Sequence, residues 1–344
     1  MLKRLVNEAS FPFTIKNLGP LLIKSGYAEV SGYDMEPVQT YRNGKLEYYI
    51  PGSSLKGVLR SHFERIARTI NTTPGVVCDP FRKANLAGGD GNPVTCEGYE
   101  EVSCGEKFQL NKAKKSGRYT NRRIIQPSNA YVYKNSCPAC RLFGSTFFAS
   151  RFDVSDGYLK PGSRKDVKKR DLVGIDRLTG GASDRAKFDL AAICAGAEFE
   201  SEIRLRNFEC WQLGAVLLLL EDLSHGLIRI GYGASRGFGN VTCDLSRVTI
   251  AMIGRSNEKQ EQILGLGAIL SDESYGTSKD DFLEPESLPE PKVEGIRTKW
   301  EFSGKELDDL RSVALPHLVR IIEGWPQRDE MEWDPERWER AANG

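Results

Sequence analysis

Two glycine-marked segments, residues 50–60 and 230–241, carry the residue types from which a phosphate-binding surface is built. Glycines let the main chain come close to a ligand and adopt positive φ angles, so that neighbouring N–H groups can converge on an anion. The side chains of Lys56, Arg60 and Arg236 supply the positive charge that a phosphate needs as its partner. Together the two segments predict contacts to a phosphate backbone.

Five of the eight cysteines gather in one stretch of the chain and could hold a metal: Cys78, Cys96, Cys104, Cys137 and Cys140. Four thiolates bind zinc tetrahedrally, and such a structural site would stabilise a loop-rich segment that has a poor core of its own. The last two cysteines have the Cys-x-x-Cys spacing of a zinc knuckle. A thioredoxin-type redox pair and unligated thiols are the alternatives, and the upstream cysteines favour the metal over the redox pair.

Charged residues are distributed unevenly, although the net charge is only +1. Residues 107–134 hold eight Lys or Arg and no acid, and residues 160–170 hold six basic residues and one Asp, whereas residues 272–294 hold eight acids and two lysines. The average therefore conceals a locally cationic surface that could attract a polyanion.

The sequence contains no apolar run long enough to span a membrane, and its start lacks the apolar core of a signal peptide. We therefore expect a cytoplasmic protein without a membrane partner. Cysteines in such a protein need an explanation other than secreted disulfides. The three histidines give little support to histidine-based catalysis, and a phosphate-binding loop of the Gly-x-x-x-x-Gly-Lys-Ser/Thr type does not occur, which argues against NTP hydrolysis.

The elements that must position these residues follow from hydrophobic periodicity. Alternating residues at 11–16 and 199–206 predict two half-buried strands, and helical spacing predicts a helix over 55–70, capped by Ser53 or Ser54. An apolar run predicts a second helix over 211–223. We expect a strand at 227–230 before the second glycine segment and a return strand at 241–253. Two β-α-β halves of this kind predict an α+β fold with a ferredoxin-like, RRM-type core.

Large insertions and a C-terminal extension complete the predicted organisation. Residues 71–135 show little periodicity and much Gly, Lys and Asn, which indicates a long insertion. Residues 271–294 are typical of a linker, and residues 303–324 of a helical appendage interrupted at Pro316. We predict a core over 1–255 with insertions at about 71–135 and 160–190, followed by a linker and helical appendage over 256–344.

The two glycine-marked segments, with Ser136-Cys137-Pro138-Ala139-Cys140-Arg141-Leu142-Phe143-Gly144-Ser145 between them, resemble the RAMP superfamily of CRISPR proteins. They are most similar to the repeated backbone subunit of type III and type IV effector complexes, over residues 10–250. The resemblance makes Cys96 the most dispensable of the five cysteines, so Cys78, Cys104, Cys137 and Cys140 are the expected zinc ligands. The RNA-binding residues that it implies in the two glycine segments are Ser53, Ser54, Lys56, Arg60, Gly231, Gly233, Ser235, Arg236, Gly237 and Phe238.

Residues 160–189 resemble the thumb of that family, a β-hairpin that wedges into the duplex of guide and target at regular intervals. Gly180 and Gly181 permit the turn, basic residues can meet phosphate, and Leu178 or Phe188 could displace a base. Arg177, Lys187 and Phe188 are the implied RNA contacts. An ordinary exposed hairpin is the alternative.

The resemblance also implies a catalytic residue. In type III backbone subunits, an acidic residue in an Asp-x-Pro loop is associated with cutting of target RNA by means of a divalent metal. This chain departs from that pattern by one residue, since it reads Asp34-Met35-Glu36-Pro37, so either Asp34 or Glu36 could occupy the position. A single carboxylate can hold Mg²⁺ beside a scissile phosphate or take a proton from an attacking 2′-OH. A solvated loop carboxylate is the alternative.

We therefore expect a guide-RNA-binding backbone subunit that oligomerises along CRISPR RNA in an RNA-guided antiviral complex and acts as a scaffold. Its expected partners are CRISPR RNA, a complementary target read by base pairing, further copies of itself and other CRISPR effector subunits. A Mg²⁺-dependent endoribonuclease within the same complex and a stand-alone, zinc-stabilised RNA-binding protein are the alternatives. The sequence leaves open whether the complex is of type III or type IV, and whether the target is RNA or DNA.

Overall fold

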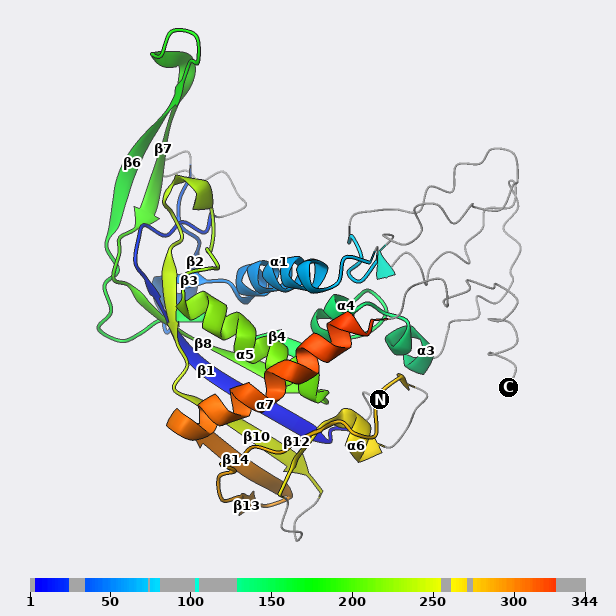
Figure 1. Cartoon of the computed structure of the whole chain (residues 1–344). Helices are drawn as coiled ribbons and strands as arrows, with labels where there is room; N and C mark the ends of the chain where they lie inside the picture. Colours follow the sequence, from blue (N-terminus) through cyan, green and yellow to red (C-terminus); the bar gives the residue numbers. More distant parts are fainter. Residues whose placement is uncertain are drawn as a thin grey trace, which may run out of the picture.

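The computed structural model describes residues 4–24, 35–73, 75–80, 103–104, 129–254, 261–270 and 275–325. Asp34, Cys96 and most of the insertion expected at 71–135 lie outside these residues. Within the described part of the chain, a ten-stranded antiparallel sheet forms the body of the molecule, and helices lie across one of its faces (Figure 1).

The sheet is centred on a long, half-buried first strand. Its order is β13 (Lys292–Glu294), β14 (Arg297–Ser303), β10 (Arg247–Ile253), β1 (Asn7–Asn17), β8 (Glu198–Arg206), β5 (Gly157–Leu159), β3 (Lys45–Ile50) and β2 (Gln39–Arg42). β4 (Phe152–Val154) also pairs with β8, and β9 (Val241–Asp244) with β1. Alternation buries Phe11, Phe13 and Ile15 on the face that the helices cover, so the strand predicted there is confirmed.

Three long helices make up the covering layer: α1 (Gly52–Ile70), α5 (Cys210–Ser224) and α7 (Gly304–Glu323). Shorter helices are α3 (Asn129–Lys134), α4 (Pro138–Phe143) and α6 (Leu266–Leu270). α5 is apolar nearly all round because it lies between the sheet and α7, and Glu209 and Gln212 form its capping box. The helix predicted from periodicity over 55–70 and the one predicted from an apolar run over 211–223 are both confirmed. The cap predicted for α1 is wrong, since Pro51 is the N-cap residue and makes no side-chain cap bond.

The C-terminal segment is built into the same core. β14 pairs with β10 along its whole length, and its Trp300 and Phe302 are fully buried. α7 continues through Pro316, so the predicted interruption is wrong. A proline removes one helical hydrogen bond, but Leu310 and Ala314 before it and Leu318 after it are buried on one face, which stabilises the helix on both sides. The boundary near residue 255 stays a prediction.

Residues 227–254 differ from the predicted pair of strands. Residues 227–230 form no strand, because the chain turns directly into the glycine-rich segment, and the N–H of Ile230 donates to the carbonyl of Gly239 at 3.0 Å. The expected return strand is divided into β9 and β10, both of which pair with β1. The glycine-rich segment is thus held at one end of β1.

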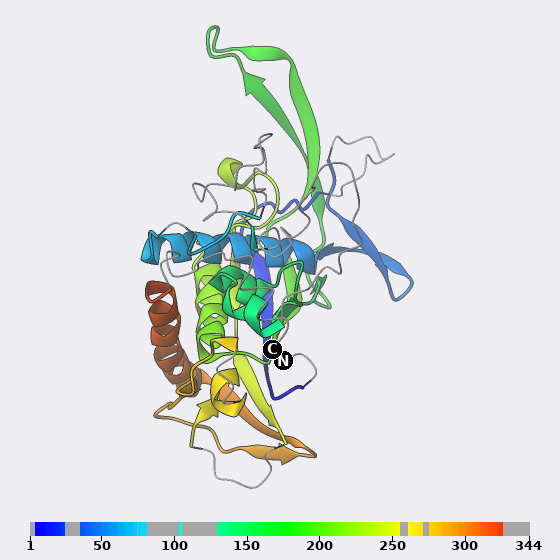
Figure 2. The ribbon, with the colours of Figure 1, turned by 90° about the vertical axis from the view of Figure 1, so that its right-hand side faces the viewer.

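A long hairpin of β6 (Val167–Ile175) and β7 (Ala182–Ile193) projects from the body (Figures 1 and 2). The sequence predicts a hairpin here. Its tip residue Leu178 is 96% exposed. Short pairings join the base of β7 to the body, namely Leu21 with Ile193 and Met35 with Leu190.

A second small sheet joins β11 (Ile263–Leu264) and β12 (Phe282–Leu283) near α6. None of the described helices is both long and apolar enough to cross a membrane.

Candidate metal centre and nucleic-acid interface

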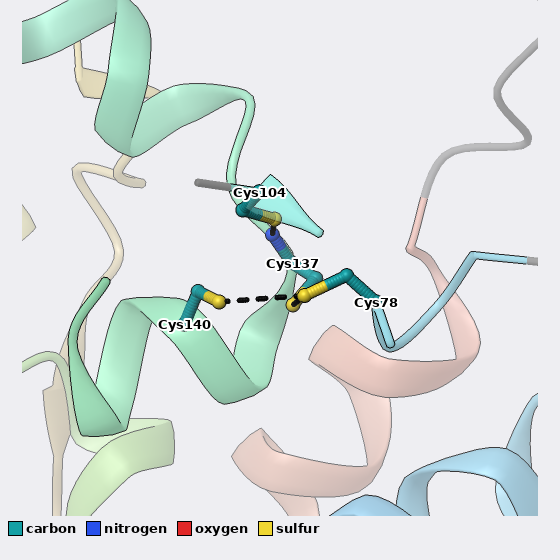
Figure 3. Close-up of side chains that lie close together, drawn as sticks. All are labelled: Cys78, Cys104, Cys137 and Cys140. Atoms are coloured by element: carbon teal, nitrogen blue, oxygen red, sulfur yellow. Dashed lines mark hydrogen bonds between the residues drawn. The ribbon is translucent and has the colours of Figure 1, made fainter. Parts of the chain in front are cut away.

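Four cysteine side chains from three separate parts of the chain converge beside α1 (Figure 3). Cys137 is the N-cap residue of α4, and Cys140 lies in the first turn of that helix, which starts at Pro138. Cys78 follows α1 in the sequence, and Cys104 lies above the other three cysteines in Figure 3. All four are buried, and their Sγ atoms lie within 4.8 Å of one another. The structure thus brings together the four cysteines predicted to bind zinc.

The sulfur spacing fits a tetrahedral metal site. The Sγ of Cys78 lies 3.6 Å from that of Cys140 and 3.7 Å from that of Cys137. Zinc–sulfur bonds of about 2.3 Å at tetrahedral angles place two sulfurs about 3.8 Å apart, whereas a disulfide bond is about 2.0 Å long. The described cysteines are free thiols. Four buried thiols at this spacing could hold a metal such as zinc.

The charge balance of the cluster also favours a cation. Hydrogen bonds from the other thiols, Cys104 first, hold the pKa of Cys137 well below its usual value. Hydrogen bonding to Cys104 and then Cys137 raises the pKa of Cys140 well above its usual value. Within the cluster the pKa values of Cys104 and Cys137 are thus lowered, whereas those of Cys78 and Cys140 are raised. A divalent metal offsets the charge of several thiolates at once.

Lys56 and Arg60 lie one turn apart on α1 and face a cleft of about 450 Å³ that adjoins the cysteine cluster. The Arg60 guanidinium contacts the Glu64 carboxylate at 2.8 Å, the Gly144 carbonyl at 3.4 Å and the Cys140 sulfur at 3.6 Å. The Lys56 ammonium donates to the Phe152 carbonyl at 3.2 Å, and burial lowers its pKa. Both side chains predicted to bind phosphate therefore already have protein partners.

In the first glycine segment, the backbone of Gly52 at the start of α1 is packed against other parts of the chain. The N–H of Gly52 donates to the Asp156 carboxylate at 2.7 Å, and a Cβ at Gly52 would lie 2.6 Å from the Val154 carbonyl. Gly52 is therefore needed for close packing of the chain. Of the two serines predicted to bind RNA, Ser53 is exposed and Ser54 is half-buried.

The second glycine segment forms an exposed turn whose ends are fixed by packing. A 3₁₀ turn, η2 (Ala234–Arg236), lies between Gly233 and Gly237, which both have left-handed φ angles. A Cβ at Gly231 would lie 2.3 Å from the Leu22 carbonyl, so that glycine allows two stretches of backbone to meet. Ser235, Arg236 and Gly237 are exposed, whereas Phe238 is buried. The turn thus presents Ser235 and Arg236 outward.

The exposed turn meets the base of the hairpin. The Arg236 guanidinium lies 5.9 Å from the ring centres of Phe188, on β7, and of Tyr232. The Lys24 ammonium also contacts Tyr232, at 5.6 Å from the centre of its ring. We call Lys24, Phe188, Tyr232 and Arg236 the hairpin-base cluster. Sequence reasoning missed Lys24 and Tyr232; an aromatic residue between two glycines was an available signal for Tyr232, but none marked Lys24.

Glu36 is held close to the same hairpin. The N–H of Ala191 donates to the Met35 carbonyl at 2.9 Å, and Pro37 pairs with Lys24. Glu36 lies between these two contacts and is half-buried. Arg177 and Lys187 lie farther along the hairpin and are exposed.

The family model described as the RAMP superfamily matches residues 14–242. This range includes α1, α4, the projecting hairpin and the second glycine segment. No curated protein matches the chain.

Proposed function

Because the chain belongs to the RAMP superfamily, and is thereby a CRISPR-associated RNA-binding or effector subunit, we propose that it is the subunit that oligomerises along guide RNA. In this proposal several copies coat one CRISPR RNA in the cytoplasm, beside other effector subunits. The complementary target is read by base pairing, because contacts to phosphates position a nucleic acid without specifying its sequence.

The observation that carries the proposal is the hairpin-base cluster. Two cations and two aromatic rings meet where the glycine-rich turn touches a hairpin that projects far from the body (Figure 2). Cations beside aromatic rings are the combination with which proteins bind single-stranded nucleic acid, since the cations attract phosphates and the rings stack on bases. The projecting hairpin is the element that we assign to the family's thumb.

The strand order supports a ferredoxin-like core. In the series β10, β1, β8 and β5, each strand is antiparallel to its neighbour. α1 follows β1 and α5 follows β8 in the chain, as in two β-α-β halves. We propose that residues 1–255 hold this core, with insertions at about 71–135 and 160–190, and that residues 256–344 extend it through β14 and α7.

We further propose that the four-cysteine cluster binds one structural zinc ion. Cys78 and Cys104 flank residues that carry few apolar side chains, and a metal would join both to α4. In this proposal the zinc takes no part in chemistry on RNA.

The test of RNA binding compares two arginine variants. We expect the wild-type chain to bind single-stranded RNAs of unrelated sequence with similar affinity, and the affinity to fall steeply with salt. Arg236→Ala should weaken binding to all of them about equally and reduce the salt slope by about one. Arg320→Ala is the matched control, because Arg320 is an exposed arginine near the end of α7, away from the hairpin (Figure 1).

Two results would overturn the proposal. One is equal weakening by Arg236→Ala and Arg320→Ala, which would indicate attraction by net charge alone. The other is a change in sequence preference at unchanged average affinity in Arg236→Ala. Tight binding of a single cellular RNA by one copy of the chain would instead support the stand-alone RNA-binding protein.

The position of Glu36 beside the hairpin base favours one second candidate, an endoribonuclease that cuts target RNA with Mg²⁺. Asp34, the other candidate, lies outside the described residues. If Glu36 is catalytic, the assembled complex cuts complementary RNA at evenly spaced positions, and Glu36→Ala abolishes cutting but spares binding. Stable binding of an intact target in both Mg²⁺ and Mn²⁺ would leave the subunit as a scaffold.

A further inference from the structure

Arg60 is fixed in place by three different partners, and one of them is a cluster sulfur. Its Nε donates to Glu64, one turn along α1, its Nη1 donates to the Gly144 carbonyl just after α4, and its Nη2 donates to the Sγ of Cys140. The Arg60 side chain is 24% exposed and that of Glu64 is 12% exposed. Such a side chain has lost most of its freedom before any ligand arrives.

A metal held by four thiolates makes the N–H···S contact of Arg60 more favourable. Four thiolates carry four negative charges, and a divalent cation neutralises two of them. A positively charged donor beside one sulfur stabilises the remaining charge, and arginine keeps its proton in proteins. The backbone N–H of Cys137 makes a comparable contact of 3.4 Å to the sulfur of Cys104.

We propose that Arg60 is a positioning residue of the metal centre, which holds the Cys140 thiolate through its Nη2 and thereby ties α1 to α4. Glu64 and the Gly144 carbonyl aim the guanidinium at the sulfur. The role assigned here differs from that of a phosphate contact, since the acidic partner Glu64 already occupies the guanidinium on one side. It depends on the metal site and is independent of RNA binding.

Lys56 provides a matched control on the same helix. It lies one turn before Arg60 and lines the same cleft. Its ammonium group donates to the Phe152 carbonyl and makes no contact with a cluster sulfur. Replacing Lys56 removes one positive charge from the cleft and leaves the N–H···S contact in place.

The test measures metal release from the full-length chain loaded with Zn²⁺ in the wild type, Arg60→Met, Arg60→Lys and Lys56→Met. Removal of a group that orients a metal ligand typically costs about 10- to 100-fold in metal affinity. We expect transfer of Zn²⁺ to a chromogenic chelator to be faster by about that factor in Arg60→Met. Arg60→Lys should lie between Arg60→Met and the wild type, and Lys56→Met should match the wild type within about twofold.

A spectrum separates this role from general loosening of the fold. In the chain loaded with Co²⁺, the sulfur-to-cobalt charge-transfer band should shift in Arg60→Met at full metal occupancy, because the thiolate has lost its donor. The proposal is overturned if Arg60→Met keeps the wild-type release rate and band. It is also overturned if Lys56→Met changes both as much as Arg60→Met, or if the wild-type chain binds neither metal. Should Arg60→Met fail to fold, Arg60→Lys decides by the same two measurements.

Discussion

Cys137 joins the metal centre to α4 through both its side chain and its backbone. It precedes the first turn of α4, and its own backbone N–H contacts the sulfur of Cys104. We expect Cys137→Ser to lower the zinc content of the purified chain from about one per molecule, because a hydroxyl is a poor substitute for a thiolate ligand. Elemental analysis measures this content directly.

Cys243→Ser is the control for that experiment, since Cys243 is a buried thiol in β9 that lies outside the cluster. It should keep the metal. Full zinc content in a Cys137→Ser, Cys140→Ser double variant would show that the four-cysteine cluster is not the zinc site.

Asp281 is a buried carboxylate that ties the C-terminal segment to the start of α5. One of its oxygens accepts the N–H of Cys210 at 2.8 Å, and the other accepts the N–H of Gly267 at 2.9 Å. Burial, and after it the charge of Glu209, raises the pKa of Asp281 to about 7. An aspartate in an unfolded chain has a pKa of about 3.9.

The raised pKa of Asp281 predicts how stability changes with pH. The folded state keeps the proton that the unfolded state loses, so the stabilisation is fully present below about pH 4 and is lost as the pH rises to about 7. Between these values Asp281 should lower the free energy of unfolding by up to about 1.4 kcal/mol per pH unit. Urea unfolding at a series of pH values should show a flatter profile for Asp281→Asn. Asp280→Asn, at the exposed neighbouring residue, is the control and should keep the wild-type profile. If the free energy of unfolding of Asp281→Asn changes with pH as steeply as that of the wild type, Asp281 is not the group responsible.

The contact between α5 and α7 is an element-scale feature that depends on one missing side chain. A Cβ at Gly214 would lie 2.4 Å from the Ala314 carbonyl on α7. We expect Gly214→Ala to lower the free energy of unfolding by about 1–3 kcal/mol, because the two helices must move apart. Chemical denaturation measures the difference.

Gly57 offers the opposite case within α1, since a Cβ there would meet nothing within 4 Å. Gly57→Ala should stabilise the chain by about 0.5–1 kcal/mol, because alanine favours a helix more than glycine does. Equal effects of the two substitutions would show that helix propensity, and not the approach of α7, dominates at Gly214.

Elements with a clear period could be predicted from the sequence, and those defined by distant contacts could not. β1, β8 and α1 each show their buried face in the spacing of apolar residues, and α5 is marked by a continuous apolar run. β14 carries the same signal in Thr298, Trp300 and Phe302, but the acidic, proline-containing stretch before it suggested a linker. The role of β14 depends on pairing with β10, which local sequence does not show.

In the candidate site, too, local spacing could be predicted from the sequence and contacts between distant segments could not. The Cys-x-x-Cys spacing marks Cys137 and Cys140, but only the fold brings Cys78 and Cys104 to them. Glycine is needed both where a ligand approaches the backbone and where another backbone does. The sequence therefore could not separate Gly52 and Gly231, which the structure shows in close packing, from glycines at a binding surface. The sequence also could not show that Arg60 faces Cys140, because that contact depends on how α1 packs beside α4.

At the scale of the whole molecule, the body and the projecting hairpin have separate tasks in the proposed assembly. The sheet with its helices and the cysteine cluster forms the body, and the hairpin extends from it beside the exposed glycine-rich turn (Figures 1 and 2). A subunit of this shape can repeat along a strand of RNA, with each copy covering a fixed length of backbone.

The most direct test of this account counts copies of the chain on RNAs of increasing length. Native mass spectrometry of the purified chain, mixed with single-stranded RNAs of unrelated sequence, gives the number of copies in each complex. We predict that this number rises in regular steps with RNA length, and that Arg236→Ala weakens every step alike, because each copy makes the same phosphate contacts. One copy per RNA at all lengths, or binding only to one sequence, would contradict it.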